Sequence, residues 1–111
     1  MNPTEQQPNE FISIHIDNGN VSLHRYDDRP DDIILTSLYV KKKRKQGNGT
    51  KLLLRAEQIA RGLHAKQIFL QAKKHSWQKQ WYNRRKYDDY EDNGNFIWMK
   101  KVLNDSASEQ M

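Results

Sequence analysis

A chain of 111 residues is long enough for one compact domain and too short for two, and its hydrophobic content of 35% predicts a small core. It has no cysteine, no apolar run of membrane-spanning length and no signal-peptide pattern, which excludes disulfide bonds and cysteine-ligated zinc; we therefore expect a cytoplasmic protein with no membrane partner and no metal site. Its net charge of +5 favours an anionic partner such as nucleic acid or a nucleotide-like cofactor.

The first part of the chain predicts a polar lead-in followed by strands. Residues 1–9 are polar and contain proline, so we expect them to be disordered. Residues 11–16 and 21–26 alternate apolar and polar side chains, as half-buried strands do, and the Asn-Gly sequence between them predicts a hairpin turn. After a charged break, residues 33–40 are almost continuously apolar and predict a central strand that is covered on both faces.

A helix and a short strand are predicted next. Residues 50–63 place apolar side chains at helical spacing on one stripe, and Gly62 stands where this helix should end. Residues 67–71 predict a short apolar strand. A strand–helix–strand unit of this length most often pairs its strands in parallel, with a right-handed crossover.

The last part of the chain predicts a second helix and a closing hairpin. Ser76 is placed to cap the N-terminus of a helix over residues 77–86. Residues 87–91 and 96–103 predict two antiparallel strands joined by a second Asn-Gly turn, followed by a polar, disordered tail at 104–111. The predicted order is β-β-β-α-β-α-β-β, which makes a single domain of mixed α/β class.

The loop Arg44-Lys45-Gln46-Gly47-Asn48-Gly49-Thr50 lies between the central strand and the long helix. The free N–H groups and the positive dipole end of a helix N-terminus together favour a bound anion, and glycines let the backbone approach it closely. Residues 41–86 hold 15 of the 19 lysines and arginines and a single acid, Glu57. We therefore predict that this loop binds a pyrophosphate.

Two common nucleotide motifs are excluded at this loop. A P-loop needs Gly-Lys-Ser/Thr, whereas Thr50 follows Gly49 directly. The three-glycine spacing of a dinucleotide-binding fold is also absent.

The loop resembles the best-known motif of the GCN5-related N-acetyltransferase (GNAT) superfamily, Arg/Gln-x-x-Gly-x-Gly/Ala. Arg44, Gly47 and Gly49 match that motif in order and spacing. The family continues with a helix, a strand, a short helix that carries an aromatic-Tyr pair, and a β-hairpin. Trp81-Tyr82 resembles that pair, and the resemblance covers residues 33–103.

Three features depart from the family pattern. His75 and Gln78 stand where the second helix of the family commonly has an asparagine and an alanine. Lys86 replaces a glycine near the end of that helix. The first strand and the first two helices of the family, which normally help to form the acceptor pocket, have no counterpart in the sequence.

The resemblance implies a GNAT-like mixed sheet with splayed central strands, acetyl-CoA as the cofactor and an amine as the acceptor, either a protein lysine or N-terminus or a small amine. Transfer through a ternary complex would use Tyr82 as the general acid, and either a monomer or a homodimer is compatible with this activity. The implied cofactor-binding residues are Leu38, Tyr39, Val40, Arg44, Lys45, Gln46, Gly47, Asn48, Gly49, Thr50 and His75.

The general base stays unassigned from the sequence. His24 and His75 have a suitable intrinsic pKa, but the sequence gives neither of them a partner. The alternative function is a non-catalytic module that binds nucleic acid or a protein through its basic face. This alternative depends on a group of aromatic residues interleaved with arginines, which suits stacking on single-stranded bases. The residues of this group are Trp77, Trp81, Tyr82, Arg84, Arg85 and Tyr87.

Overall fold

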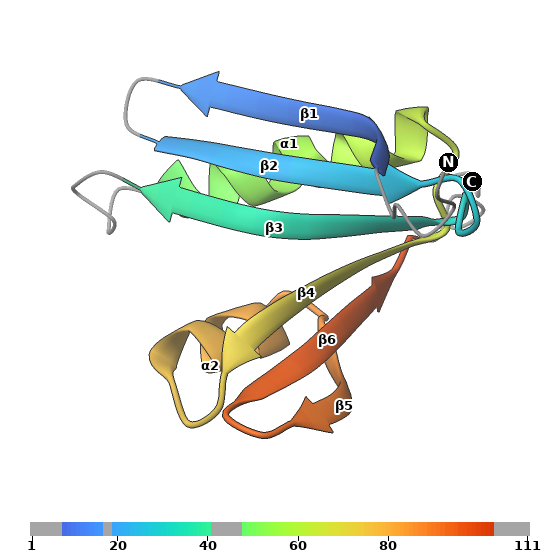
Figure 1. Ribbon diagram of the computed structural model, residues 1–111. Coiled ribbons are helices and arrows are strands. Elements are labelled where there is room, and N and C mark those ends of the chain that lie inside the picture. The colour runs from blue at the N-terminus through green and yellow to red at the C-terminus, as the bar shows by residue number, and fades with distance from the viewer. Residues whose placement is uncertain (1–7, 17–18, 41–47, 104–111) are drawn as a thin grey trace, which may run out of the picture.

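Apolar side chains recur at strand and helix spacing along the chain and build one sheet with two helices against it (Figure 1). The computed structural model describes residues 8–16, 19–40 and 48–103. Within them the six strands follow the order β1-β2-β3-β4-β6-β5, parallel between β3 and β4 and antiparallel elsewhere. The elements are β1 Pro8–Ile16, β2 Gly19–Tyr26, β3 Asp32–Val40, α1 Asn48–Gly62, β4 Gln67–Lys73, α2 Trp77–Arg84, β5 Asp88–Asn93 and β6 Phe96–Val102.

This order confirms the predicted succession of elements, with small differences at their ends. β1 begins at Pro8, so the last two residues of the predicted lead-in are part of a strand. α1 begins at Asn48 and therefore includes Gly49 in its first turn. The predicted disorder at residues 1–7 and 104–111 lies outside the described residues. Neither helix in the described part of the chain combines the length and the apolar character needed to cross a membrane.

Local capping and turn chemistry fix the last three elements. Ser76 caps α2 as predicted, because its Oγ accepts a hydrogen bond from the backbone N–H of Lys79 at 3.2 Å. Gly94 has a φ of 74° in the turn between β5 and β6, where the second Asn-Gly sequence predicts a hairpin. Lys86 has a φ of 76° just after α2, which explains why a glycine suits this position in the family pattern.

Both helices contribute to a single core on one face of the sheet. Along β4, Leu70 and Ala72 are buried in this core, while Gln71 and Lys73 are exposed on the opposite face. The same alternation continues on β6, where Ile97 and Met99 are buried. The largest fully buried side chains are Tyr87, Leu23, Ile33, Leu52, Leu53, Ile68, Leu70, Met99 and Val21.

The two central strands separate toward their C-terminal ends, as the resemblance predicts (Figure 1). Only the first three residues of β3, Asp32 to Ile34, pair with β4. A bulge follows, because Ser22 pairs with Ser37 and Leu23 pairs with Leu35, which leaves Thr36 as an extra residue. Bulges bend a strand and increase its twist, and this one turns β3 away from β4.

The divergence corrects one expectation about β3. The continuous apolar pattern predicts a strand that is covered on both faces, but Thr36, Ser37 and Tyr39 are exposed. The prediction is wrong for this half of the strand because the core and both helices of the described residues lie on one face of the sheet, so side chains on the other face stay uncovered (Figure 1).

A buried carboxylate links the two halves of the sheet. Glu57 of α1 is 2% exposed and accepts a hydrogen bond from the Tyr87 hydroxyl at 2.9 Å. The Lys101 ammonium of β6 lies 3.1 Å from both of its carboxylate oxygens. α1 packs mainly on β2 and β3, so this cluster connects it to the half of the sheet that contains β6. A buried charge costs free energy unless it is paired in this way.

Removing this carboxylate should destabilise the fold. Glu57→Ala leaves the Lys101 ammonium and the Tyr87 hydroxyl without their partner, which costs roughly 3 kcal/mol for a buried pair. We expect the free energy of unfolding, measured by urea denaturation, to fall by that amount. The control Lys66→Ala removes only an exposed partner of Asp31 at 4.0 Å and should change it by less than about 0.5 kcal/mol. Equal effects of the two variants would contradict the linking role of Glu57.

Candidate functional site

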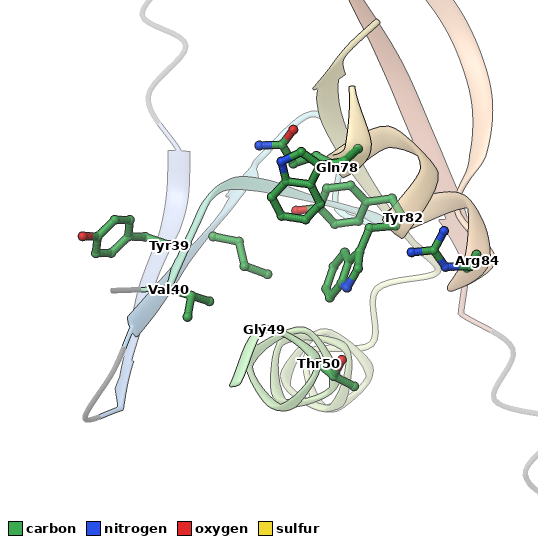
Figure 2. A pocket seen from close by; sticks show the side chains of 10 residues that line it. Tyr39, Val40, Gly49, Thr50, Gln78, Tyr82 and Arg84 are labelled. Atoms are coloured by element: carbon green, nitrogen blue, oxygen red, sulfur yellow. The ribbon is translucent and has the colours of Figure 1, made fainter. Parts of the chain in front are cut away.

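A cavity of about 710 Å³ lies where β3 and β4 have separated, beside the N-terminus of α1 (Figure 2). We call it the helix-side cavity. Six residues predicted from the sequence line it: three from β3, two from the first turn of α1, and Tyr82 from α2. Its lining residues are Leu38, Tyr39, Val40, Gly49, Thr50, Trp77, Gln78, Trp81, Tyr82 and Arg84.

The N-terminus of α1 opens toward this cavity. The first turn of the helix contains no acidic residue, so no carboxylate of this turn competes for its N–H groups and positive dipole end. A Cβ atom at Gly49 would lie 3.4 Å from Cζ2 of Trp81 and 3.6 Å from Cγ2 of Val40. Both distances are ordinary van der Waals contacts, so a methyl group at this position would fit between Val40 of β3 and Trp81 of α2.

Arg85 brings a positive charge to this helix terminus. Its Nη2 donates to the Thr50 hydroxyl at 3.2 Å, and its Nη1 donates to the Trp81 carbonyl at 3.0 Å. The guanidinium also lies 4.0 Å from the centre of the Trp81 ring, a cation–π distance. The site predicted from the sequence lacks this residue, because no local pattern indicates that Arg85 reaches Thr50, 35 positions away in the chain.

Tyr82 is buried at the inner end of the helix-side cavity, where Figure 2 shows its side chain extending from α2 into the cleft. Its ring makes edge contacts with Trp81 and Tyr87, at centroid distances of 5.1 and 5.7 Å. Burial raises the pKa of Tyr82 to about 12. The hydroxyl is protonated at neutral pH, as it would be at its ordinary pKa, and it is a weaker acid than an exposed phenol.

A second cavity, of about 280 Å³, lies in the gap between β3 and β4. We call it the strand-gap cavity. It shares Leu38, Gln78 and Tyr82 with the helix-side cavity, so the two meet around the Tyr82 side chain. Its other lining residues are Leu35, Thr36, Ser37, Leu70, Gln71, Ala72, Lys73 and Phe96.

The structure does not bring every predicted residue to these cavities. His75 is exposed in the turn before α2, with a φ of 59°, and lines neither cavity. His24 on β2 packs edge-on against Phe11 at 4.7 Å and also lines neither. Asn48 begins α1. The predictions for Arg44, Lys45, Gln46 and Gly47 lie outside the described residues.

The aromatic residues of the nucleic-acid alternative do not form an open platform. Tyr87 is fully buried and Tyr82 is 8% exposed, and both belong to the core. Base stacking needs exposed ring faces, so these two rings do not serve it. Trp77 is 53% exposed, so its ring is accessible to solvent.

Comparisons with known proteins give a fold but no close relative. No protein-family model matches the sequence, and no curated protein matches it. An acetyltransferase from Bacillus cereus is 25% identical with a TM-score of 0.72, covering 93% of this chain and 80% of its own. An acetyltransferase of the GNAT family from Staphylococcus aureus is 18% identical with a TM-score of 0.66, covering 78% of this chain and 60% of its own.

A third similar structure holds a ligand. The PaiA N-acetyltransferase from Thermoplasma acidophilum, in complex with coenzyme A, is 22% identical with a TM-score of 0.70. The match covers 77% of this chain but only 53% of the Thermoplasma chain. The chain thus spans about half the length of that protein.

The burial of Tyr82 predicts how stability changes at high pH. Its pKa is about 12 in the folded state and about 10 when unfolded, so its stabilising contribution is complete below pH ~10 and is lost as the pH rises toward ~12. We expect Tyr82→Phe to show a shallower alkaline decline in the free energy of unfolding, measured by denaturant titration across this range. The exposed control Tyr90→Phe should keep the wild-type slope. A wild-type slope in Tyr82→Phe would show that Tyr82 ionises normally.

Proposed function

The chain has the fold of the GNAT acetyltransferases, and from this premise we propose that it binds acetyl-CoA and transfers the acetyl group to an amine. The single observation that carries the proposal is the position of the helix-side cavity. It joins the N-terminus of α1 to the point where β3 and β4 diverge, with Tyr82 between them. The helix terminus, the gap between the strands and the Tyr82 hydroxyl therefore border one continuous cavity.

The anion site suits the phosphates of coenzyme A. The backbone N–H groups of Gly49 and Thr50 belong to a helix N-terminus without a nearby acid in its first turn, and Arg85 adds a guanidinium beside Thr50. Arg84 lines the same cavity. Together these residues would hold the pyrophosphate and the additional phosphate of the ligand.

β3 offers a hydrogen-bonding edge along the cleft. Beyond Ile34 this strand no longer pairs with β4, while its other edge stays paired with β2 as far as Val40. The polar backbone groups on the open edge therefore need another partner. The amide groups of a pantetheine arm have the donors and acceptors to provide one, at the residues predicted from the sequence, Leu38 to Val40.

Tyr82 is placed to donate the proton that the reaction needs. Bound acetyl-CoA supplies an activated acetyl group as a thioester. The neutral amine forms a C–N bond to the carbonyl carbon and loses a proton to solvent, while the C–S bond breaks. The Tyr82 hydroxyl, which is protonated at neutral pH, gives its proton to the departing sulfur and regains one from solvent.

Binding of the cofactor can be tested apart from catalysis. Acetyl-CoA at saturating concentration should raise the Tm, because it binds only the folded state. Arg85→Gln removes one charged hydrogen-bond donor and should raise the Kd by about tenfold. The matched control Arg55→Gln, at an exposed position of α1, should bind like the wild type. Acetyl-CoA that leaves the Tm unchanged would overturn the proposed function.

The role of Tyr82 predicts a separation of turnover from binding. Tyr82→Phe keeps the ring but removes the proton donor, so kcat should fall by roughly 100-fold or more while the Kd for acetyl-CoA stays within about twofold. Thiol release gives kcat, and calorimetry gives Kd. Tyr90→Phe, which lies on β5 away from both cavities, should match the wild type in both. Unchanged turnover in Tyr82→Phe would remove Tyr82 from the mechanism.

A further inference from the structure

The strand-gap cavity has an unusual charge for a site that accepts an amine. Lys73 is the one lysine, arginine, aspartate, glutamate or histidine among its described lining residues. The polar groups around it are neutral: the hydroxyls of Thr36 and Ser37 on β3 and the amides of Gln71 and Gln78. A site built this way carries a net positive charge.

The charge of Lys73 is not cancelled by a neighbour. Within the described residues the structure gives its ammonium no carboxylate partner, and the side chain is exposed at the end of β4. The adjacent Lys74 is different, because its Nζ lies 2.7 Å from an oxygen of Asp92. Asp89 is likewise paired with Lys79 at 3.0 Å. Two of the acids of β5, Asp89 and Asp92, are thus engaged with other lysines.

This cavity is where the acceptor would approach under the proposed function, on which the inference rests. The helix-side cavity would be taken by the cofactor, and the two cavities meet at Tyr82. An acceptor that reaches the thioester next to Tyr82 therefore comes through the strand-gap cavity. Its charge then meets Lys73.

Electrostatics at Lys73 separate the classes of amine. A polyamine or a lysine-rich peptide would bring further positive charges toward an unpaired ammonium, which is unfavourable. An amine that also carries a carboxylate would pair with it. Hydroxyl and amide groups on both sides of the gap can hold either end of such a molecule, and Phe96, Leu35 and Leu70 add apolar surface.

The absence of a base among the described lining residues points to the same class. No aspartate, glutamate or histidine lines the strand-gap cavity, so the amine has to release its proton to solvent. A lysine side chain with a pKa of about 10.4 is rarely neutral at pH 7, and an α-amine is the less basic of the two. The carboxylate of a free amino acid raises the pKa of its own ammonium group, and pairing that carboxylate with Lys73 offsets part of this rise.

We propose that the acceptor is an α-amino acid whose carboxylate pairs with the Lys73 ammonium while its amine faces the thioester beside Tyr82. Lys73 is then the residue that selects the acceptor by charge.

The experiment compares acceptors with and without this carboxylate, and rates are expressed per neutral amine because the carboxylate raises the pKa of the adjacent ammonium group. The protein is supplied with acetyl-CoA and, separately, with each proteinogenic amino acid, its carboxamide, and spermidine, and thiol release is followed. As a second readout, N-acetyl amino acids are titrated calorimetrically into the protein saturated with CoA. We expect at least one amino acid to react, and its acetylated form to bind, about tenfold better than the carboxamide, the size of one charge-assisted hydrogen bond.

Variants of Lys73 test whether this residue causes the preference for a carboxylate. Lys73→Glu should abolish the preference for the carboxylate or reverse it toward the carboxamide, and Lys73→Gln should remove it. Lys66→Glu makes the same charge change at an exposed residue that lines neither cavity and should keep the preference. The rise in Tm with acetyl-CoA shows that each variant is folded and binds the cofactor.

Three results would overturn the inference: a carboxamide or spermidine that is acetylated as well as the amino acid, a preference that survives in Lys73→Glu, or no reaction and no product binding with any amino acid. If acetyl-CoA still raises the Tm in these cases, only the acceptor class is wrong. If it does not, the proposed function itself fails.

Discussion

The loss of pairing between β3 and β4 beyond Ile34 is the constraint on which the rest of this structure depends. A parallel pair that continued along the sheet would close the space between the strands. The bulge at Thr36 prevents this and leaves one edge of β3 free of strand partners. Both cavities, the open backbone edge and the position of Tyr82 between them follow from that single interruption.

A sheet that is opened in the middle needs other connections between its halves. The hydrogen bonds absent from the β3–β4 ladder are replaced by contacts of α1 with the second half of the chain. At one point Glu57 binds Tyr87 and Lys101 in the core. At another, Arg85 binds Thr50 at the cavity margin. The first is buried in the core, whereas the second lies at the helix terminus where the proposed function places the phosphates.

The electrostatic layout divides the cleft into two regions. At the helix-side cavity, a helix N-terminus and the arginines after Trp81-Tyr82 favour phosphate groups. At the strand-gap cavity, a single lysine stands among neutral hydroxyls and amides. Tyr82 lies at the junction, in an environment dry enough to keep its phenol protonated. In the proposed function, the basic residues of one cavity bind the phosphates of the cofactor, and the lysine of the other binds the carboxylate of the acceptor.

Much of the fold and part of the site could be predicted from the sequence, because both depend on local patterns. Alternation of apolar residues, the capping serine at 76 and the Asn-Gly turn at 93–94 act over a few residues and gave the order of elements. The order in turn placed Leu38 to Val40, Gly49, Thr50 and Tyr82 around one cleft. The sequence alone thus determined the class of fold and the position of the helix terminus for which anion binding is proposed.

Only the tertiary structure decided which side chains meet across the cleft. The apolar run of β3 predicted burial on both faces, but the helices of the described residues cover only one face of the sheet (Figure 1). Arg85 contacts Thr50, Tyr87 is buried in the core, and His75 lines neither cavity. The local sequence around these residues does not distinguish between these three environments. Lys73 borders Thr36 and Ser37 only because β3 and β4 converge at one end and diverge at the other. Such contacts join residues tens of positions apart, and no local periodicity encodes them.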